Sequence, residues 1–449
     1  MSKRFCDRFL LTIATAIFGM AFAKAQALHS LSVDDAIALA KKNNIAVKAA
    51  LTNLAIQEQS NKEITADALP LVAGTAGTIA FFQTPVTLVP GQFFGGAPGS
   101  TIAVSFQPKY AASAGATLTQ KIFDGSVFVG LKARKSSLDY YKKAIDLAIE
   151  DLTVSVYKTY YQLVVSKTQV QFADSNISRA EKLLHDTKVM NENGFAEKLA
   201  VDKASVQLSN LITDKHNTET SITNGFLQLK FLIGVPAADS VIVTTEFDEA
   251  ALRSGIPIDI DYNSYKNRNS YQSLEITKML SDFDIKRYQS AYYPTASLTG
   301  SYQKNAYNNT YDFFSKSGEW YSTSYVGLNI NVPIFSGFAK DARLKKARLN
   351  ASLINDQIEN LKLNINLQVA NSKNDFINAI QTMDFQKGNM ELAESVYNQT
   401  KKKFESGLAT NTDLSTAQQD LIQAQVNYLN ALYTAVVAKV NFLYAVGKI

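Results

Sequence analysis

The sequence of 449 residues is poor in the residue types that form most metal sites and many enzyme sites. It holds one cysteine and three histidines. The cysteine, Cys6, lies close to the N-terminus. His29, His185 and His216 have no cysteine or carboxylate at the spacing of a metal-ligand set. We therefore expect surface histidines instead of a metal site, no disulfide, no cofactor and no enzymatic activity.

A strong charge of one sign and a long internal apolar run are also missing. The net charge is +5, and residues near the N-terminus supply more than half of it, so the balance does not call for a nucleic acid partner. Beyond the N-terminal segment, no stretch offers the roughly 18 uninterrupted apolar residues of a membrane helix. The closest stretch, residues 431–446, contains Lys439 and Asn441. If the protein meets a membrane, we expect it to do so with strands.

The N-terminus has the features of a secretory signal peptide. Three basic residues precede an apolar segment, residues 9–23, and Ala-Lys-Ala follows at residues 23–25. This order of basic, apolar and small residues is typical of a cleaved export signal. We predict that residues 1–25 are removed, and an uncleaved membrane anchor is the alternative.

The remaining chain repeats one pattern twice. Residues 115–125 read GATLTQKIFDG, and residues 327–337 read GLNINVPIFSG. A repeat of roughly 210 residues is too long for a solenoid unit and indicates a duplicated domain with pseudo-twofold symmetry. We predict a first structural repeat in residues 26–236, a linker or equatorial segment in residues 237–262, and a second repeat in residues 263–449.

Each repeat is expected to begin with a helix and to continue with two strands. The helices are predicted over residues 32–67 and 265–291, and each stops before a proline. Beyond that proline the apolar residues recur with a period of two, which indicates strands. Four strands of roughly ten residues, the length of a tilted transmembrane strand, are predicted over residues 71–82, 112–123, 294–302 and 325–334, with loops at residues 85–100 and 304–318.

Aromatic residues gather near the ends of these strands, as they do in the interfacial girdles of membrane barrels. The predicted girdle residues are Phe81, Phe82, Phe123, Trp320, Tyr321 and Phe335. The core of a soluble β-sandwich is the alternative interpretation of the same strand pattern.

Long helices are expected after the strands, over residues 127–192 and 338–405. Each would span roughly 100 Å and would turn back at a glycine into an antiparallel partner, over residues 198–233 or 413–446. Four strands per chain cannot close a barrel, and an open sheet edge in lipid leaves backbone groups unpaired. Three chains would supply twelve strands, and the polar faces of the strands favour a barrel of that width with a hydrated lumen over an eight-stranded one from two chains.

This duplicated order, the two Ile-Phe-x-Gly turns and residues 403–414 (KFESGLATNTDL) resemble the TolC-like outer membrane efflux protein family. The resemblance implies a mixed, mainly α fold: a homotrimer whose twelve-stranded outer membrane β-barrel continues into a long α-helical coiled-coil tunnel in the periplasm. The implied function is that of a passive exit duct in a tripartite efflux or type I secretion system. Its partners would be a periplasmic adaptor (membrane fusion) protein, an inner-membrane transporter of RND or ABC type, and outer membrane lipid.

The resemblance also assigns roles to residues at the tips of the two helical hairpins. Asp413 matches the first of two gate carboxylates, Thr416 stands at the position of the second, and Phe404 matches an aromatic residue of the closed state. The implied adaptor-docking residues are Gly194, Phe195, Ala196, Gly407, Leu408 and Ala409. From the residues alone, Asp413 can equally be part of a capping box that begins at Thr410, and both glycines can be left-handed helix ends.

One alternative function belongs to a different class. An exported structural or adhesive coiled-coil protein with a soluble β domain would also need long helices and alternating strands. Such a protein would need neither a porous trimer nor an adaptor. The sequence favours no one substrate among drugs, metals and polypeptides.

Overall fold

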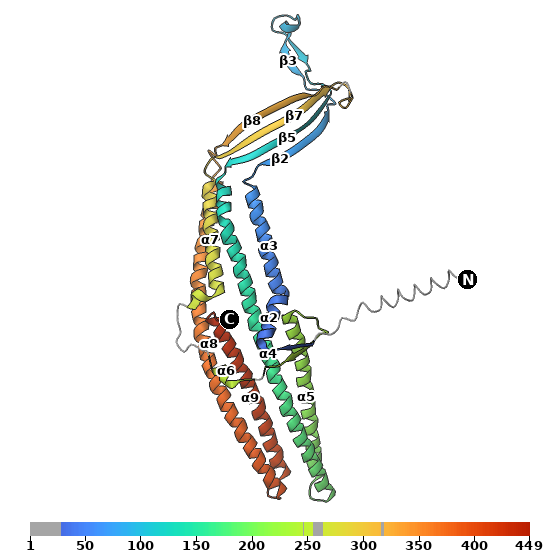
Figure 1. The fold of residues 1–449 in the computed structure, drawn as a ribbon, viewed down its shortest axis with the longest axis vertical. Helices are drawn as coiled ribbons and strands as arrows, with labels where there is room; N and C mark the ends of the chain where they lie inside the picture. The colour runs from blue at the N-terminus through green and yellow to red at the C-terminus, as the bar shows by residue number, and fades with distance from the viewer. Residues whose placement is uncertain (1–27, 246, 255–263, 316–317) are drawn as a thin grey trace, which may run out of the picture. The chain divides into compact units, whose positions relative to one another are not determined.

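The computed structural model describes residues 28–245, 247–254, 264–315 and 318–449. The predicted signal peptide with Cys6, and residues 255–263 at the end of the predicted linker, lie outside the described residues. The chain is mainly helical (Figure 1). It forms two compact units, and each unit takes segments from both predicted repeats. The first unit comprises residues up to 52, 143–272 and 360–449, and the second comprises residues 53–142 and 273–359.

The elements follow one another in the expected order. The helices are α2 (Val33–Asn43), α3 (Ile45–Ala66), α4 (Gly125–Glu192), α5 (Lys198–Ile233), α6 (Glu249–Arg253), α7 (Asn269–Ser290), α8 (Ala339–Glu405) and α9 (Asn411–Ala445). The strands are β1 (Leu28–Leu31), β2 (Leu71–Ala80), β3 (Thr87–Pro90), β4 (Thr101–Val104), β5 (Tyr110–Phe123), β6 (Ser240–Val243), β7 (Thr295–Asn308) and β8 (Tyr321–Asn331). Within the described ranges, every helix falls short of the combined length and apolarity that crossing a membrane requires.

The first predicted helix is divided at Asn44. Its backbone there is extended, with φ −58° and ψ 136°. The Asn44 side chain donates from Nδ2 to Leu232 O at 2.8 Å and accepts from Ala46 N through Oδ1 at 2.8 Å. The expectation of one helix over residues 32–67 is therefore wrong, because a contact 188 positions away in the chain holds the break.

Tyr160 of α4 lies at the centre of the main core of the first unit and is fully buried. Its hydroxyl donates to Leu31 O at 2.8 Å and accepts from Thr245 N at 3.1 Å. Strand β1 pairs in parallel with β6, and these bonds attach the carboxyl-terminal ends of both strands to α4. The predicted linker thus packs on the long helix through β6.

A buried ion pair joins the two predicted repeats within the first unit. Glu150 of α4 and Arg268 are each about 3% exposed, and Arg268 Nε lies 3.7 Å from Glu150 Oε1. The guanidinium also donates to Tyr444 O at 2.8 Å and lies 4.0 Å from the centre of the Tyr444 ring, while Asn269 Nδ2 donates to Glu150 Oε2 at 3.1 Å. Removing one partner would leave the other charge buried and unpaired, which is costly in a protein interior.

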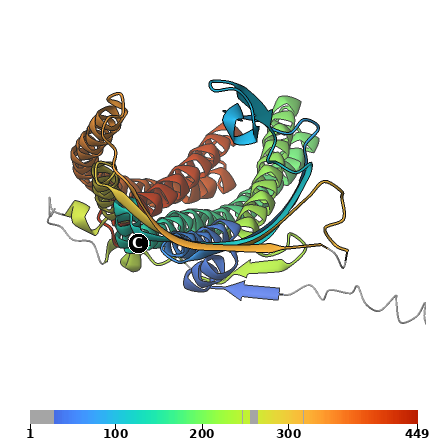
Figure 2. The same ribbon diagram turned by 90° about the horizontal axis from the view of Figure 1, so that it is seen from above.

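The second unit contains one four-stranded antiparallel sheet in the order β2-β5-β7-β8. Seen from above, these strands form a single curved layer (Figure 2). Strands β2 and β8 are its two edges, and each has one side without a hydrogen-bonded neighbour in the described chain. On β8, Val326, Leu328 and Ile330 are 77, 60 and 62% exposed. A single chain therefore leaves an apolar sheet face and two backbone edges uncovered.

The loop predicted at residues 85–100 is a short hairpin. Strands β3 and β4 pair antiparallel from Thr87↔Val104 to Pro90↔Thr101, and a 3₁₀ turn at Gly91–Phe94 separates them. The expectation of a loop is wrong for residues 87–90, which form β3: the glycines lie in the turn at residues 91–100, and the β-branched Thr87 and Val89 pair with Val104 and Ile102 of β4. This hairpin makes the segment between β2 and β5, residues 81–109, longer than the segment between β7 and β8, residues 309–320.

We predict that Tyr160→Phe lowers the stability of the helical unit by roughly 1–3 kcal/mol, because Thr245 N loses its bond to the Tyr160 hydroxyl and Leu31 O keeps only the bond from Thr244 N. The matched control is Tyr157→Phe: Tyr157 packs against the same core, and its hydroxyl forms no hydrogen bond within the described ranges. The midpoint of thermal loss of the helical circular dichroism signal should fall for the first variant alone. Equal midpoints for the two variants would contradict this account.

Candidate functional site

Both helical hairpins turn with the same backbone geometry. Phe195 N donates to the carbonyl five residues back at 2.8 Å, and Leu408 N does the same at the second tip, also at 2.8 Å. The residue before each donor must adopt a left-handed conformation in this type of helix end. Gly194 and Gly407 do so, with φ of 75° and 77°. The structural role that the sequence suggested for these glycines is present at both tips.

The predicted docking residues form the outer surface of the two turns. Phe195 and Leu408 are 81 and 80% exposed, whereas Ala196 and Ala409 are half-buried beside them. Large apolar side chains with this exposure are available to another protein. Each tip therefore presents one apolar residue at the same place in the same turn.

Asp413 closes a capping box at the start of α9. Thr410 N and Thr410 Oγ1 donate to Asp413 Oδ2 at 2.8 and 2.7 Å, and Asp413 N donates to Thr410 Oγ1 at 3.1 Å. The hydrogen bond from the Thr410 side chain, followed by that from its backbone, lowers the pKa of the Asp413 carboxyl. Asp413 is exposed, and α5 has no side-chain cap at the corresponding place. The tip of the second hairpin therefore has a carboxylate held by a capping box, and the corresponding position of the first hairpin has none.

The other two gate candidates lie in different surroundings. Phe404 is half-buried and packs on a cluster that joins α4, α8 and α9. Thr416 is exposed, one turn beyond the capping box. The fold thus brings Phe404 and Asp413 to the same hairpin tip, Phe404 through packing within the chain and Asp413 at the surface.

A buried ladder of polar side chains connects α9 to α4. Asn176 Nδ2 donates to Gln425 Oε1 at 2.8 Å, and Gln418 Nε2 donates to Asn176 O at 3.2 Å. Nearer the tip, Asn411 Nδ2 donates to Thr187 Oγ1. Buried amides that satisfy one another fix the register of two helices, because sliding either helix would leave them unpaired. The ladder holds α9 in register with α4.

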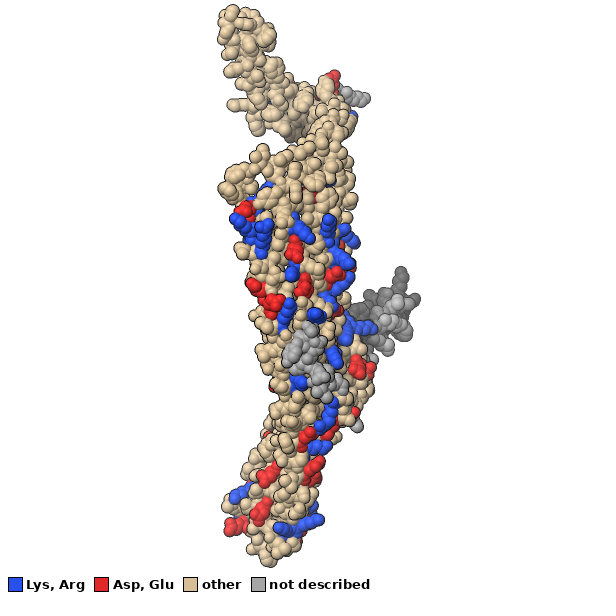
Figure 3. Space-filling view, turned by 90° about the vertical axis from the view of Figure 1, so that its left-hand side faces the viewer, with Lys and Arg blue, Asp and Glu red and all other residues tan. Residues whose placement is uncertain are grey.

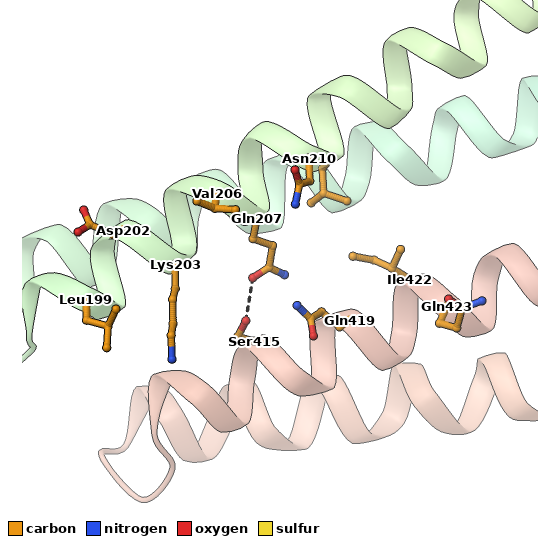
Figure 4. Close-up of a pocket in the computed structure, with 11 residues that line it drawn as sticks. Leu199, Asp202, Lys203, Val206, Gln207, Asn210, Ser415, Gln419, Ile422 and Gln423 are labelled. Atoms are coloured by element: carbon orange, nitrogen blue, oxygen red, sulfur yellow. Dashed lines mark hydrogen bonds between the residues drawn. The ribbon is translucent and has the colours of Figure 1, made fainter.

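The contact between α9 and α5 is different in kind. A hollow of about 620 Å³, lined by both polar and apolar side chains, lies between the two helices (Figure 4). Figure 4 marks one hydrogen bond among the residues drawn, from Ser415 Oγ to Gln207 Oε1 at 2.7 Å, while the side chains of Lys203 and Gln419 extend into the gap. Helix α9 is thus held to α4 by several buried hydrogen bonds, whereas the hollow leaves fewer contacts between α9 and α5.

The sequence analysis did not identify this ladder. Gln418 and Gln425 are spaced by one heptad beside the buried positions Leu414 and Leu421. Polar residues at such spacing within an apolar stripe could have indicated a buried amide contact. Their partner Asn176 is on another helix, so the pairing itself leaves no local pattern.

The predicted girdle residues lie at the two ends of the sheet. Phe82, Phe335 and Tyr321 are 100, 77 and 56% exposed, and Phe123 is 43% exposed. Trp320 is half-buried, and its Nε1 donates to Phe313 O at 3.1 Å.

Phe81 is also half-buried. Phe335 and Phe338 form an edge-to-face pair with ring centres 5.6 Å apart. Most of these rings are free to contact a membrane or a second copy.

The described ranges contain no group of three or more His, Cys, Asp or Glu residues that could hold a metal ion. His29 Nε2 lies 3.7 Å from Asp239 Oδ2, and His185 and His216 are exposed on helices.

Residues 263–448 match the family model described as "Outer membrane efflux protein". Among curated proteins, the chain is similar to "Outer membrane protein TolC" of Vibrio cholerae, at 22% identity over 75% of this chain and 77% of that protein. It is also similar to "Probable efflux pump outer membrane protein TtgC" of Pseudomonas putida, at 22% identity over 66% of this chain and 60% of that protein.

Among solved structures, the fold is similar to that of CusC, described in work on its folding and transmembrane channel formation. The TM-score is 0.75 over 92% of each chain, at 16% sequence identity. At this identity the likeness establishes the fold alone.

We predict opposite effects for two glycine-to-alanine substitutions in α8 and its tip. Gly407→Ala should destabilise the hairpin by about 1–2 kcal/mol, because alanine resists the left-handed conformation. Gly388→Ala, in the middle of α8 with no atom near the new Cβ, should stabilise it by about 0.5–1 kcal/mol. Thermal unfolding and limited proteolysis at the tip measure both. The same sign of change in the two variants would contradict a purely conformational role for Gly407.

Proposed function

We propose that this chain, a TolC-like outer membrane efflux protein, is the exit duct of an efflux or secretion system. It acts as a passive trimeric conduit that opens when it docks to a periplasmic adaptor and an inner-membrane pump. One observation carries the proposal: a four-stranded sheet with two open edges and an exposed apolar face continues into long helical hairpins. The sheet belongs in the outer membrane and the hairpins in the periplasm.

The strand order of the sheet allows further copies of the chain to close it into a barrel, which supports the trimer. The strands alternate in direction through β2, β5, β7 and β8, so a neighbouring copy's β2 can pair with β8 and keep the antiparallel order. In lipid, each unpaired edge group would cost several kcal/mol, and only a closed ring removes both edges. Three copies give twelve strands, enough for a lumen that side chains do not fill.

The duplication supports the same assembly. We infer that residues 26–236 and 263–449 are two structural repeats joined by residues 237–262. Each supplies two strands and one long helical hairpin, and the family model spans the second of them. Six such hairpins in a trimer would surround a tunnel with near-sixfold symmetry.

At the tips, we propose that Phe195 and Leu408 contact the adaptor and that three copies of Asp413 form the constriction. A ring of one carboxylate per chain attracts cations, and its carboxylates repel one another when the ring is narrow. The capping bonds keep each carboxylate ionised and aimed, so the structural role and the gate role are compatible. Because buried hydrogen bonds join α9 to α4 and a hollow lies between α9 and α5, opening would separate α9 from α5 first.

The names of the relatives favour efflux as the process. TtgC is described as a probable efflux pump component. A second relative, PrtF of Dickeya chrysanthemi, is described as a protease secretion protein but matches only 38% of this chain. We therefore propose efflux of small molecules ahead of polypeptide secretion.

The function is tested on the purified protein and on membrane fractions. We expect it in the outer membrane fraction, migrating as a trimer in detergent gels until heated, and forming cation-attracting channels in planar bilayers. A product found entirely in the aqueous periplasmic fraction would overturn the proposal and favour the exported structural or adhesive coiled-coil protein.

We predict that Asp413→Ala raises single-channel conductance or lowers cation selectivity, because the constriction loses its ring of charge. Asp35→Ala is the matched control. Ser32 and Asp35 form the same capping box at the start of α2, with the same lowered pKa, away from the tips. Planar bilayer recordings should change for the first variant alone. Unchanged recordings for both would leave Asp413 only its role as a helix cap.

A further inference from the structure

Exposed basic residues surround the ends of α4 and α8 that follow the sheet. We name Lys132, Lys135, Arg343, Lys346 and Arg348 the basic collar. The strands next to it are different: residues 68–108, which include β2, β3 and β4, contain no charged side chain, and β5 and β7 contain one lysine each, Lys121 and Lys304. On the face drawn in Figure 3, Lys and Arg side chains gather over the helical segments next to the sheet, and the sheet and hairpin carry almost none. Charged side chains are therefore sparse on the strands and frequent in the helical segments that follow them.

The positive charge of the collar is not neutralised within the chain. Residues 339–350 contain one acidic residue, Asp341, and its carboxylate pairs with Lys345 at 2.9 Å. The first 14 residues of α4 contain no acidic side chain. Within the described ranges, none of the five collar residues forms an ion pair. Exposed cations in this state attract a diffuse counter-ion layer or a fixed anionic surface.

Two collar residues share a hollow that suits an oxyanion. Arg343 and Lys346, one turn apart on α8, line a space of about 480 Å³ together with Ser281, Tyr288 and Asn350. One carboxylate, that of Asp284, also lines it and pairs with Arg287 at 3.2 Å. A guanidinium, an ammonium, two hydroxyls and an amide offer several donors to one group, which is the pattern that recognises phosphate oxygens.

The collar lies where headgroups would lie if the sheet spans a bilayer. Phe335 and Phe338, 77 and 74% exposed, come directly before α8 and suit the edge of the hydrocarbon layer. Headgroups occupy about 5–7 Å beyond that edge. Arg343 is four residues into α8 and Lys346 seven, about 6 and 10 Å along the axis, and their long side chains reach back toward the interface.

We propose that the basic collar binds the phosphodiester headgroups of anionic phospholipid in the leaflet on the helical side of the sheet. Arg343 and Lys346 hold one headgroup in their hollow, while Lys132, Lys135 and Arg348 attract the surrounding lipid surface. The inference rests on the proposed placement of the sheet in a membrane. It adds a lipid preference to a sheet whose apolar face alone would accept any bilayer.

The test compares two double variants in nanodiscs of mixed phosphatidylglycerol and phosphatidylcholine. Arg343→Gln with Lys346→Gln removes the hollow's two cations. Lys402→Gln with Lys403→Gln removes the same charge at the far end of the same helix, and is the matched control. Native mass spectrometry of the released trimers measures how much of each lipid is retained. We expect wild type and control to retain phosphatidylglycerol preferentially, and the collar variant to lose about tenfold of that preference.

Three results would overturn the proposal: no lipid preference in wild type, equal preference in the collar variant, or equal loss in the control. A further arm adds inorganic phosphate at constant ionic strength. Displacement of phosphatidylglycerol by millimolar phosphate would show a site for free phosphate instead of lipid. Conductance and trimer migration are measured on the same samples. If the trimers conduct but show no lipid preference, the proposed lipid binding is rejected and the proposed function is not.

Discussion

The unpaired backbone edges of β2 and β8 impose the strongest constraint on this molecule. The sheet cannot end at those strands in a lipid environment, because every free N–H and C=O there would lack both water and a partner. An exposed apolar edge in water would be no better, since it invites pairing with any other strand. Three features of the sheet agree with its closure into a duct. They are its curvature, the alternation of strand direction, and the apolar face that no part of the described chain covers.

The helical part solves a separate problem, that of holding very long helices in one register. Apolar seams alone permit sliding by a heptad, whereas a buried polar group permits one alignment. Asn176 and Gln425 supply such a group between α4 and α9, and Glu150 and Arg268 supply another where the two halves of the chain meet. Both tie a segment before residue 236 to one after residue 263. Each compact unit therefore contains segments of both predicted repeats.

Much of this fold is predictable from local sequence. The alternation along residues 325–334 predicted a strand where β8 lies, and Pro70 and Pro294 predicted the starts of β2 and β7. Thr410 with Asp413 predicted a capping box that is present. The structure differs from the sequence prediction where a residue far away in the chain determines the local conformation. Asn44 ends a helix because Leu232 offers a carbonyl, and the amide ladder depends on a partner helix. The hairpin of β3 and β4 has a different cause, since its turn residues concealed two short strands. The roles of the tip residues remain predictions, because they concern copies and partners outside a single chain.

The central strand pairing determines the order in which the protein can assemble. Tyr110 pairs with Asn308 and Phe123 with Ala296, so β5 meets β7 only after the whole intervening hairpin has been delivered. Contacts of such long separation form late, because a large loop must close first. The core around Tyr160 is different, since all its members precede β7 in the chain. A polypeptide interrupted after α5 would thus be partly folded, yet would carry β2 and β5 as an apolar hairpin with no neighbour. Such a fragment would expose strand edges that can pair with other chains.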